Sequence, residues 1–274
     1  MNKTLLRLKA DRICWRHFTR RGYAAFSSLH KEISIGVLSV ATLLAAAPSS
    51  AAGGHSVMAM CANGDAAYAS DAWAESDEEP DLTILQPGDL LFNAVAQRVG
   101  TGGAIADVTQ GVASEPIVHV AIVCRHAGQT YALEASGKHG VWLNPIDSFF
   151  VHSDHSPEGK PLVLVGRLRD QSVVAESISR AMKYVGRPYD YLFGESEDSI
   201  YCSELVHYAF RKADGSFVFP QQPMSFHDNT GKVTQFWKDV YSRHGREVPE
   251  GEPGTNPGAI SRSEEIEIVK CYYK

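Results

Sequence analysis

The sequence predicts an α+β fold in which a small antiparallel sheet packs against helices. Short apolar runs with strand-like composition lie at Leu90 to Ala94, Ile117 to Val123 and Thr130 to Ala135, and turn residues separate them. Later segments change to helical spacing, first across Gln171 to Val185 and then from Cys202 onward. Strands followed by helices, without regular alternation, favour an α+β arrangement over a parallel sheet.

The remaining elements follow along the chain. Gln86 to Asp89 is expected to be a turn, and Gly100 to Gly103 a flexible loop, because the glycine cluster lacks the Gly-Lys-Ser/Thr ending of a phosphate loop. The helix across Gln171 to Val185 is expected to end before Pro188 and to place one apolar stripe in the core: Val174, Ile178, Met182 and Val185. Further elements are expected as strands at Gly140 to Leu143, Leu162 to Leu168 and Ile266 to Tyr272, a short helical turn at Pro145 to Phe150, and a last helix at Thr230 to Tyr241.

Two polar residues stand out in apolar strands. His119 interrupts one run, and Glu134 interrupts the next. If Arg125 to Gly128 form a tight hairpin turn, residues whose numbers sum to about 253 face each other. We therefore expect His119 and Glu134 to project from the same sheet face, within reach of one another.

Cys202 opens the apolar pattern of the later helix and so lies in its first turn. A thiol there feels the positive end of the helix dipole, which favours the nucleophilic thiolate. With His119 and Glu134 it supplies the parts of a thiol triad. Each residue also has a plainer interpretation: a small buried thiol, a core histidine and a carboxylate on a solvated face.

Five blocks make the chain resemble the permuted papain-like amidases of the YaeF/YiiX type, within the NlpC-type cysteine peptidase superfamily. They are Gln86 to Phe92, His119 to Val123, Leu133 to Ala135, Gly186 to Asp190 and Tyr201 to Val206, in that family's order. The resemblance implies a circularly permuted papain-like domain at 81–274, with histidine before cysteine. It also implies Cys202 as nucleophile, His119 as general base and Glu134 as the residue that orients the imidazole.

The expected activity is cleavage of an amide or isopeptide bond through a thioester, without a cofactor or a metal. Backbone N–H groups at the start of the Cys202 helix would hold the oxyanion, and Tyr201 and Ser203 are candidates for shaping that pocket. A cell-wall peptide is the first substrate class and a lipid amide the second. An acyltransferase and a non-catalytic lipid- or peptide-binding protein remain alternatives. We expect a monomer.

The N-terminal segment predicts export. A basic region, the uncharged run from Ile33 to Ala47 and small residues near Ala52 have the order of a signal peptide at 1–52, followed by a flexible lead at 53–80. Eight of the 26 basic and two of the 32 acidic residues lie in 1–52, so the remainder carries a net charge of −12. This charge argues against nucleic acid or an anionic membrane as a partner. We expect a periplasmic or secreted protein with no membrane span after signal removal.

The other cysteines and histidines suggest structural roles. Cys61 is not expected to carry a lipid, because Met58 to Met60 puts a large side chain where a small one is needed. A disulfide between Cys61 and Cys271 is open, while Cys124 is expected to be a packed free thiol. The loop with His152 and His155 is expected to be solvated rather than to bind a metal.

Overall fold

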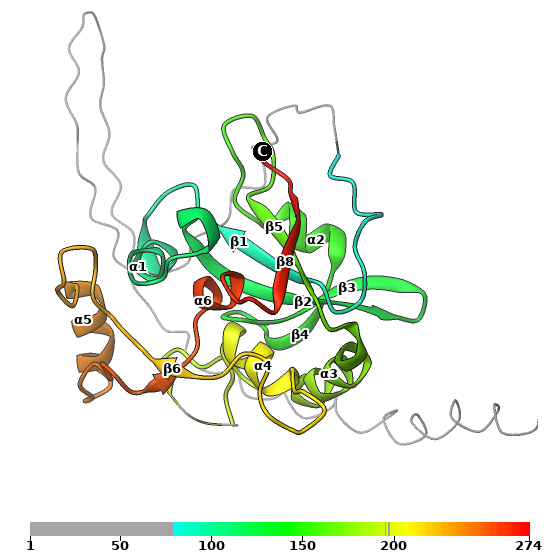
Figure 1. Cartoon of the computed structure of the whole chain (residues 1–274). Coiled ribbons are helices and arrows are strands. Elements are labelled where there is room, and N and C mark those ends of the chain that lie inside the picture. The colour runs from blue at the N-terminus through cyan, green and yellow to red at the C-terminus, as the bar shows by residue number, and fades with distance from the viewer. Residues whose placement is uncertain (1–78, 195, 197) are drawn as a thin grey trace, which may run out of the picture. The chain divides into compact units, whose positions relative to one another are not determined.

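The central element is a six-stranded antiparallel sheet with the strand order β4-β3-β2-β1-β5-β8 (Figure 1). The structure is a computed structural model that describes residues 79–274 except 195 and 197. The strands are β1 (Leu90–Ala94), β2 (Ile117–His126), β3 (Gln129–Ser136), β4 (Gly140–Pro145), β5 (Val163–Leu168) and β8 (Ile266–Cys271). With helices packed on this sheet, the predicted α+β class is confirmed.

The β2–β3 hairpin has a different register from the one predicted. Ile122 pairs with Leu133, so facing residues sum to 255 rather than 253. The loop is the two residues Ala127 and Gly128, with φ of 49° and 82°. Tight hairpin turns favour positive φ at both central positions, and Gly128 adopts it without steric cost. A shift of two residues keeps every side chain on its predicted face.

Helices cover both faces of the sheet. On one face, Val120 and Ile122 of β2 share a core with Leu205 of α4 (Cys202–Ala209), and α3 (Val174–Ala181) packs beside α4. On the other, the alternate β2 residues Ala121 and Val123 share a core with α2 (Ile146–Val151). From Ile117 to Val123, β2 is therefore apolar on both faces, which makes His119 conspicuous.

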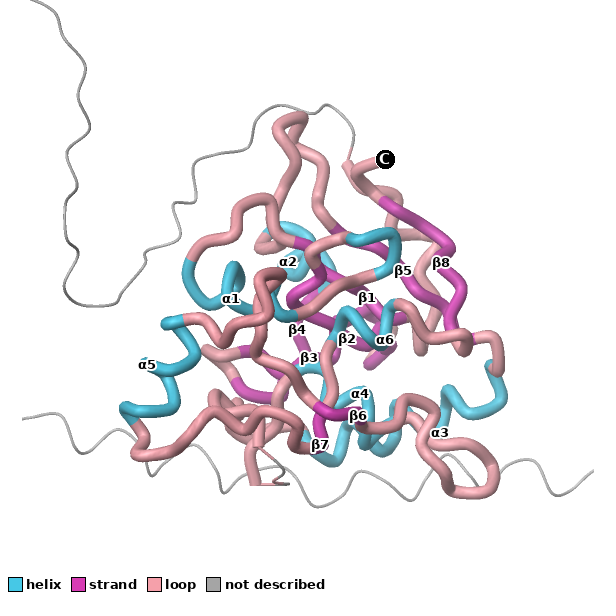
Figure 2. Tube along the Cα trace, turned by 60° about the vertical axis from the view of Figure 1, so that its left-hand side comes forward, coloured by secondary structure: helices cyan, strands magenta, loops and turns pink. Residues whose placement is uncertain are grey.

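A third apolar cluster joins segments that are distant in sequence, including Ala104 of α1 (Gly100–Val108) and Trp237 of α5 (Gln235–Arg243). Figure 2 shows α5 at the left and the short strand pair β6–β7 near α4 and α6. The smaller elements are β6 (Gln222–Pro223), β7 (Pro253–Gly254), α6 (Pro257–Ser261) and the 3₁₀ turns η1 (Val112–Ser114), η2 (Gln171–Val173) and η3 (Met182–Tyr184).

Two further predictions were wrong. The segment from Gly100 to Gly103 was expected to be a loop but is the start of α1. Gly103 is needed there for close packing, since a Cβ at this position would lie 2.3 Å from the Arg98 carbonyl carbon. The helix across 171–185 is α3 flanked by η2 and η3, and Val185 is 43% exposed rather than in the core. Val185 follows the 3₁₀ turn η3, so the α-helical period no longer determines where its side chain points.

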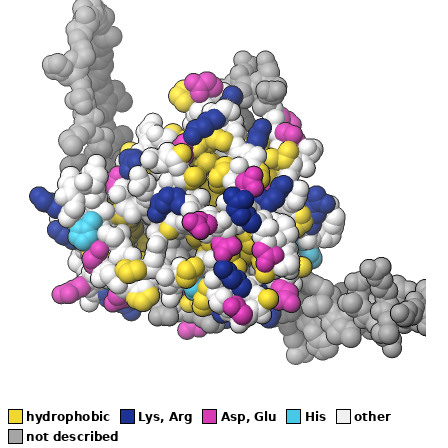
Figure 3. All heavy atoms as spheres, in the orientation of Figure 1, with side chains coloured by type: hydrophobic (Ala, Val, Ile, Leu, Met, Phe, Trp, Pro, Cys, Tyr) yellow, Lys and Arg dark blue, Asp and Glu magenta, His cyan; other side chains and the backbone are white. Residues whose placement is uncertain are grey.

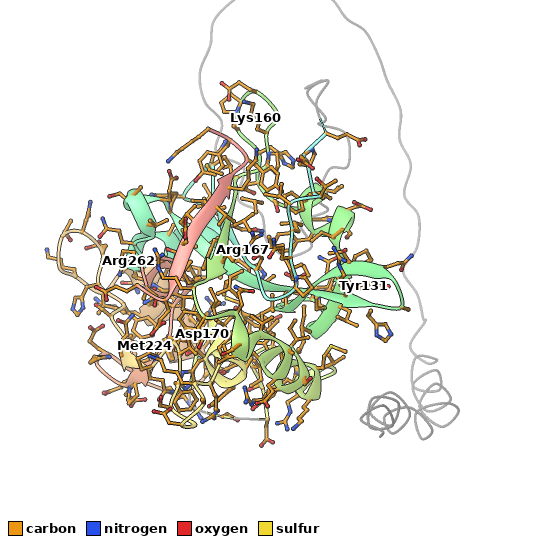
Figure 4. The ribbon with its side chains drawn as sticks, turned by 45° about the vertical axis from the view of Figure 1, so that its right-hand side comes forward. Tyr131, Lys160, Arg167, Asp170, Met224 and Arg262 are labelled. Atoms are coloured by element: carbon orange, nitrogen blue, oxygen red, sulfur yellow. The ribbon has the colours of Figure 1, made fainter. Side chains whose placement is uncertain are left out.

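A buried ion pair fixes the start of β1 against β5. Asp89, only 1% exposed, accepts hydrogen bonds of 2.8 Å from both Nε and Nη2 of Arg167 (labelled in Figure 4). The backbone N–H of Gln86 donates to the same carboxylate. The Gln86 to Asp89 turn is therefore held by a bidentate charge pair.

Basic and acidic side chains are interspersed over the face shown in Figure 3. Among residues 79–274, apart from 195 and 197, no helix has the length and apolar character needed to cross a membrane. The expected signal peptide at 1–52, the lead at 53–80 except its last two residues, and Cys61 lie outside the described residues.

Candidate active site

Cys202 is the first residue of α4, as predicted. Tyr201 caps the helix with extended backbone angles, and its N–H faces the Glu204 carboxylate at 3.4 Å. Cys202 is 4% exposed and borders a cavity. Its sulfur therefore lies at the positive end of a helix while it remains accessible from one side.

His119 and Glu134 meet as predicted. His119 Nε2 lies 2.6 Å from Glu134 Oε2, and the side chains are 20% and 6% exposed. They contact each other diagonally across β2 and β3, because the hairpin pairs Ile122 with Leu133. Since Glu134 occupies Nε2, Nδ1 is the nitrogen left for the hydrogen bond that His119 makes with Cys202.

Strand β4 completes the hydrogen bonding of Glu134. Trp142 Nε1 and Asn144 Nδ2 donate to Oε1 at 3.1 and 2.9 Å. Burial alone would raise the pKa of Glu134, but the hydrogen bond and charge of His119, together with these two donors, hold it below its ordinary value. Sequence reasoning missed Trp142 and Asn144. They are two residues apart on the strand that pairs with β3, so alternation places both side chains on one sheet face, which was the signal available in the sequence.

The same network changes the protonation of His119. Burial alone would lower its pKa, but hydrogen bonds and charge interactions with Cys202 and Glu134 outweigh burial and raise the pKa from 6.5 to about 10. The site therefore favours an imidazolium that interacts with Cys202 on one side and with Glu134 on the other. That charge distribution suits a thiol nucleophile that is activated before the substrate arrives.

Cys202 lies in the wall of a cavity of about 60 Å³. Tyr201 and Ser203 also line it, but each hydroxyl is engaged by Thr255: Tyr201 accepts from the Thr255 N–H at 3.1 Å, and the Ser203 and Thr255 hydroxyls lie 3.1 Å apart. The two residues thus fix one wall of the cavity. Its other lining residues are mostly apolar and include Ile105, Val108, Val118, Tyr189, Phe193, Met224, Phe226 and Trp237.

Tyr189 was not singled out from the sequence, although it lies in a block that resembles the family. It lines the cavity with Cys202. Burial, followed by the negative charges of Cys202 and Asp190, raises the pKa of Tyr189 well above its ordinary value. The phenol thus stays protonated, as a hydrogen-bond donor close enough to feel the Cys202 charge.

The remaining thiol and histidine expectations can be compared with the described part of the chain. Cys124 is a buried free thiol, as expected, and burial raises its pKa to about 11. His152 Nδ1 lies 2.7 Å from the Ser148 carbonyl oxygen. No group of three or more His, Cys, Asp or Glu within the described ranges is arranged to hold a metal ion.

The chain is similar to known proteins over about two thirds of its length. Uncharacterized protein YiiX of Escherichia coli K12 is 28% identical over 188 residues, which cover 67% of this chain and 85% of that protein. A crystal structure described as metalloprotein YiiX of Escherichia coli O157:H7 superposes with a TM-score of 0.55 at 23% identity, covering 69% of this chain and 98% of the other. Residues 84–270 match the family model described as "permuted papain-like amidase enzyme, YaeF/YiiX, C92 family". This chain therefore belongs to the permuted papain-like amidase family of the YaeF/YiiX type.

Proposed function

We propose that the protein is a cysteine amidase with Cys202 as nucleophile, His119 as general base and acid, and Glu134 as the residue that orients the imidazole. The observation that carries the proposal is the hydrogen-bonded series Cys202–His119–Glu134 beside a cavity. Family membership supports the broader assignment to cysteine hydrolases.

The reaction then takes two steps. The Cys202 sulfur bonds to the carbonyl carbon, the thiol proton having passed to His119, and a tetrahedral oxyanion forms. As it collapses, the C–N bond breaks, His119 gives its proton to the leaving nitrogen, and a thioester remains. Water, deprotonated by His119, attacks the thioester, and the acid product leaves as the proton returns to the Cys202 sulfur.

Oxyanion stabilisation is assigned to backbone N–H groups at the start of α4 and to the Tyr189 hydroxyl. The first N–H groups of a helix lack intrahelical acceptors, so they are available to a developing negative charge. The hydroxyl oxygens of Tyr201 and Ser203 accept hydrogen bonds from Thr255, so the two side chains are assigned to fixing the cavity wall.

The substrate is proposed to be an amide in a peptide, with a lipid amide as the second class. The apolar lining beside Cys202 fits a group of low polarity next to the scissile bond. The related crystal structure is described as that of a metalloprotein. Each step proposed here uses only side-chain and backbone groups of this chain.

An electrophilic amide or thioester probe, followed by mass analysis of the labelled peptide, tests the proposal. We expect label on Cys202, loss of label in Cys202→Ala and unchanged label in the matched control Cys124→Ala. His119→Ala should slow labelling more than Glu134→Ala, because Glu134 acts through the imidazole. Equal labelling of Cys124 and Cys202 would contradict the activated thiol.

We also propose that the protein works outside the cytoplasm after removal of residues 1–52. The support is the order of basic region, uncharged run and small residues in the sequence. Cell fractionation with N-terminal sequencing tests this. A cytoplasmic protein that begins at Met1 would refute it.

A further inference from the structure

A second cavity, of about 440 Å³, adjoins the one beside Cys202. Tyr189, Phe193 and Trp237 line both cavities, so these three aromatic side chains form a common wall. The small cavity has room only for a group next to the scissile bond, whereas the second has room for a side chain and a terminal group. The lining of the second cavity includes Phe236, Trp237, Val240 and Arg243 of α5.

The second cavity is walled by ordered aromatic rings. Trp237 contacts Phe236 and Phe193 edge to face, with ring centroids 5.2 and 5.7 Å apart, and Tyr189 contacts Tyr191 at 5.0 Å. Tyr191 is 59% exposed, although its hydroxyl is bonded to a backbone carbonyl. Edge-to-face walls with an exposed ring favour an aromatic guest, because a further ring can continue the same contacts.

The rim of this cavity is basic. Arg243 and His244, at the C-terminal end of α5, line it, and no carboxylate of the described residues does. Arg243 donates from Nε to the Asp239 backbone carbonyl, and no ion pair joins it to a carboxylate of the described residues. In a chain with a net charge of −6, an Arg without a carboxylate partner beside an aromatic cavity is suited to bind a carboxylate.

Trp237 supplies an independent sign of a ligand. It is 2% exposed, and its Nε1 has no hydrogen-bond partner among the described residues. A buried N–H without an acceptor is costly, and such groups are normally paired. A carbonyl that enters between the two cavities would satisfy it.

We propose that the second cavity binds the leaving side of a peptide substrate that ends in an aromatic residue with a free carboxylate. This inference rests on the proposed amidase function and narrows its substrate class. The ring packs among Phe236, Tyr191 and Trp237, and the carboxylate pairs with Arg243. A long acyl chain would fill the same volume, but it would leave Arg243 and the Trp237 N–H without partners.

The test measures binding without turnover, so that it does not depend on the chemistry. Calorimetry on Cys202→Ala compares N-acetyl-Ala-Phe with its carboxamide and with N-acetyl-Ala-Ala. We expect the free acid of the Phe peptide to bind most tightly. Adding Arg243→Gln to this variant should weaken the affinity for the free acid of the Phe peptide by about two- to fivefold and leave the affinity for the carboxamide unchanged. The control is Lys238→Gln, on the exposed side of α5, which should change neither affinity.

A hydrophobic variant tests the other half of the proposal. Phe236→Ala should remove the preference for Phe over Ala while keeping the preference for acid over carboxamide. Equal binding of the three peptides to Cys202→Ala, or tighter binding of N-palmitoyl glycine amide than of the Phe acid, would overturn the inference. Either result would leave probe labelling of Cys202, and hence the amidase proposal, intact.

Discussion

Replacing Cys202 with Ala should lower the pKa of His119 substantially. That pKa is about 10 against an ordinary 6.5, so the folded site favours the imidazolium by roughly 5 kcal/mol relative to a free side chain. Burial opposes this preference, and the interactions with Cys202 and Glu134 produce it. The variant keeps the burial and Glu134 but loses the hydrogen bond and the charge interaction that Cys202 makes with His119.

The magnitude follows from the removal of one of two anionic partners. An opposite charge within a few ångströms shifts a pKa by about one to three pH units, so we expect the pKa of His119 to fall by that amount. A pH titration of imidazole ¹⁵N shifts measures it, with His119→Gln to assign the resonance among the 11 histidines.

The control is Cys124→Ala, which removes a buried thiol from β2, the strand that carries His119. It should leave the pKa of His119 near 10. If Cys202→Ala also left it there, the thiolate would not be a partner of the imidazole. The proposed activation of Cys202 would then fail.

Three further outcomes are expected. The pKa of Glu134 lies below its ordinary 4.5 in the folded state, so the ionised carboxylate stabilises the fold above pH 4.5. This contribution disappears as the pH falls through the folded pKa. In urea unfolding, the free energy of unfolding of Glu134→Gln should therefore depend less on pH in the acid range than that of the wild-type protein. Tyr189→Phe should lower kcat by roughly 100-fold, because it removes a hydrogen-bond donor to the oxyanion, and should leave the unfolding midpoint unchanged. A kcat equal to that of the wild-type protein would show that the Tyr189 hydroxyl has no part in the mechanism. Arg167→Gln should lower the free energy of unfolding by about 3 kcal/mol, because Asp89 stays buried without its cation, whereas the exposed Arg169→Gln should cost less than about 1 kcal/mol; similar losses would contradict the argument.

Much of the fold could be predicted because its signals are local. Strand runs, the hairpin and the helix that begins at Cys202 depend on spacing and turn chemistry within a few residues. The contact between His119 and Glu134 was predicted from the alternation of side chains between the two sheet faces. The predicted register was wrong by two residues, but a shift of two residues leaves both side chains on the same face. The expected loop at Gly100 failed because glycine also serves close packing, which spacing alone does not reveal.

By itself, the sequence determined the residue types of the site, their order along the chain and the elements that carry them. Only the tertiary structure decided how Glu134 is kept ionised, since its donors Trp142 and Asn144 come from the next strand. It also decided the cavities, whose walls combine segments from Thr101 to Pro257. Helical and strand periods report which side of an element is apolar, but a cavity is the space left between elements, and their packing alone sets its shape.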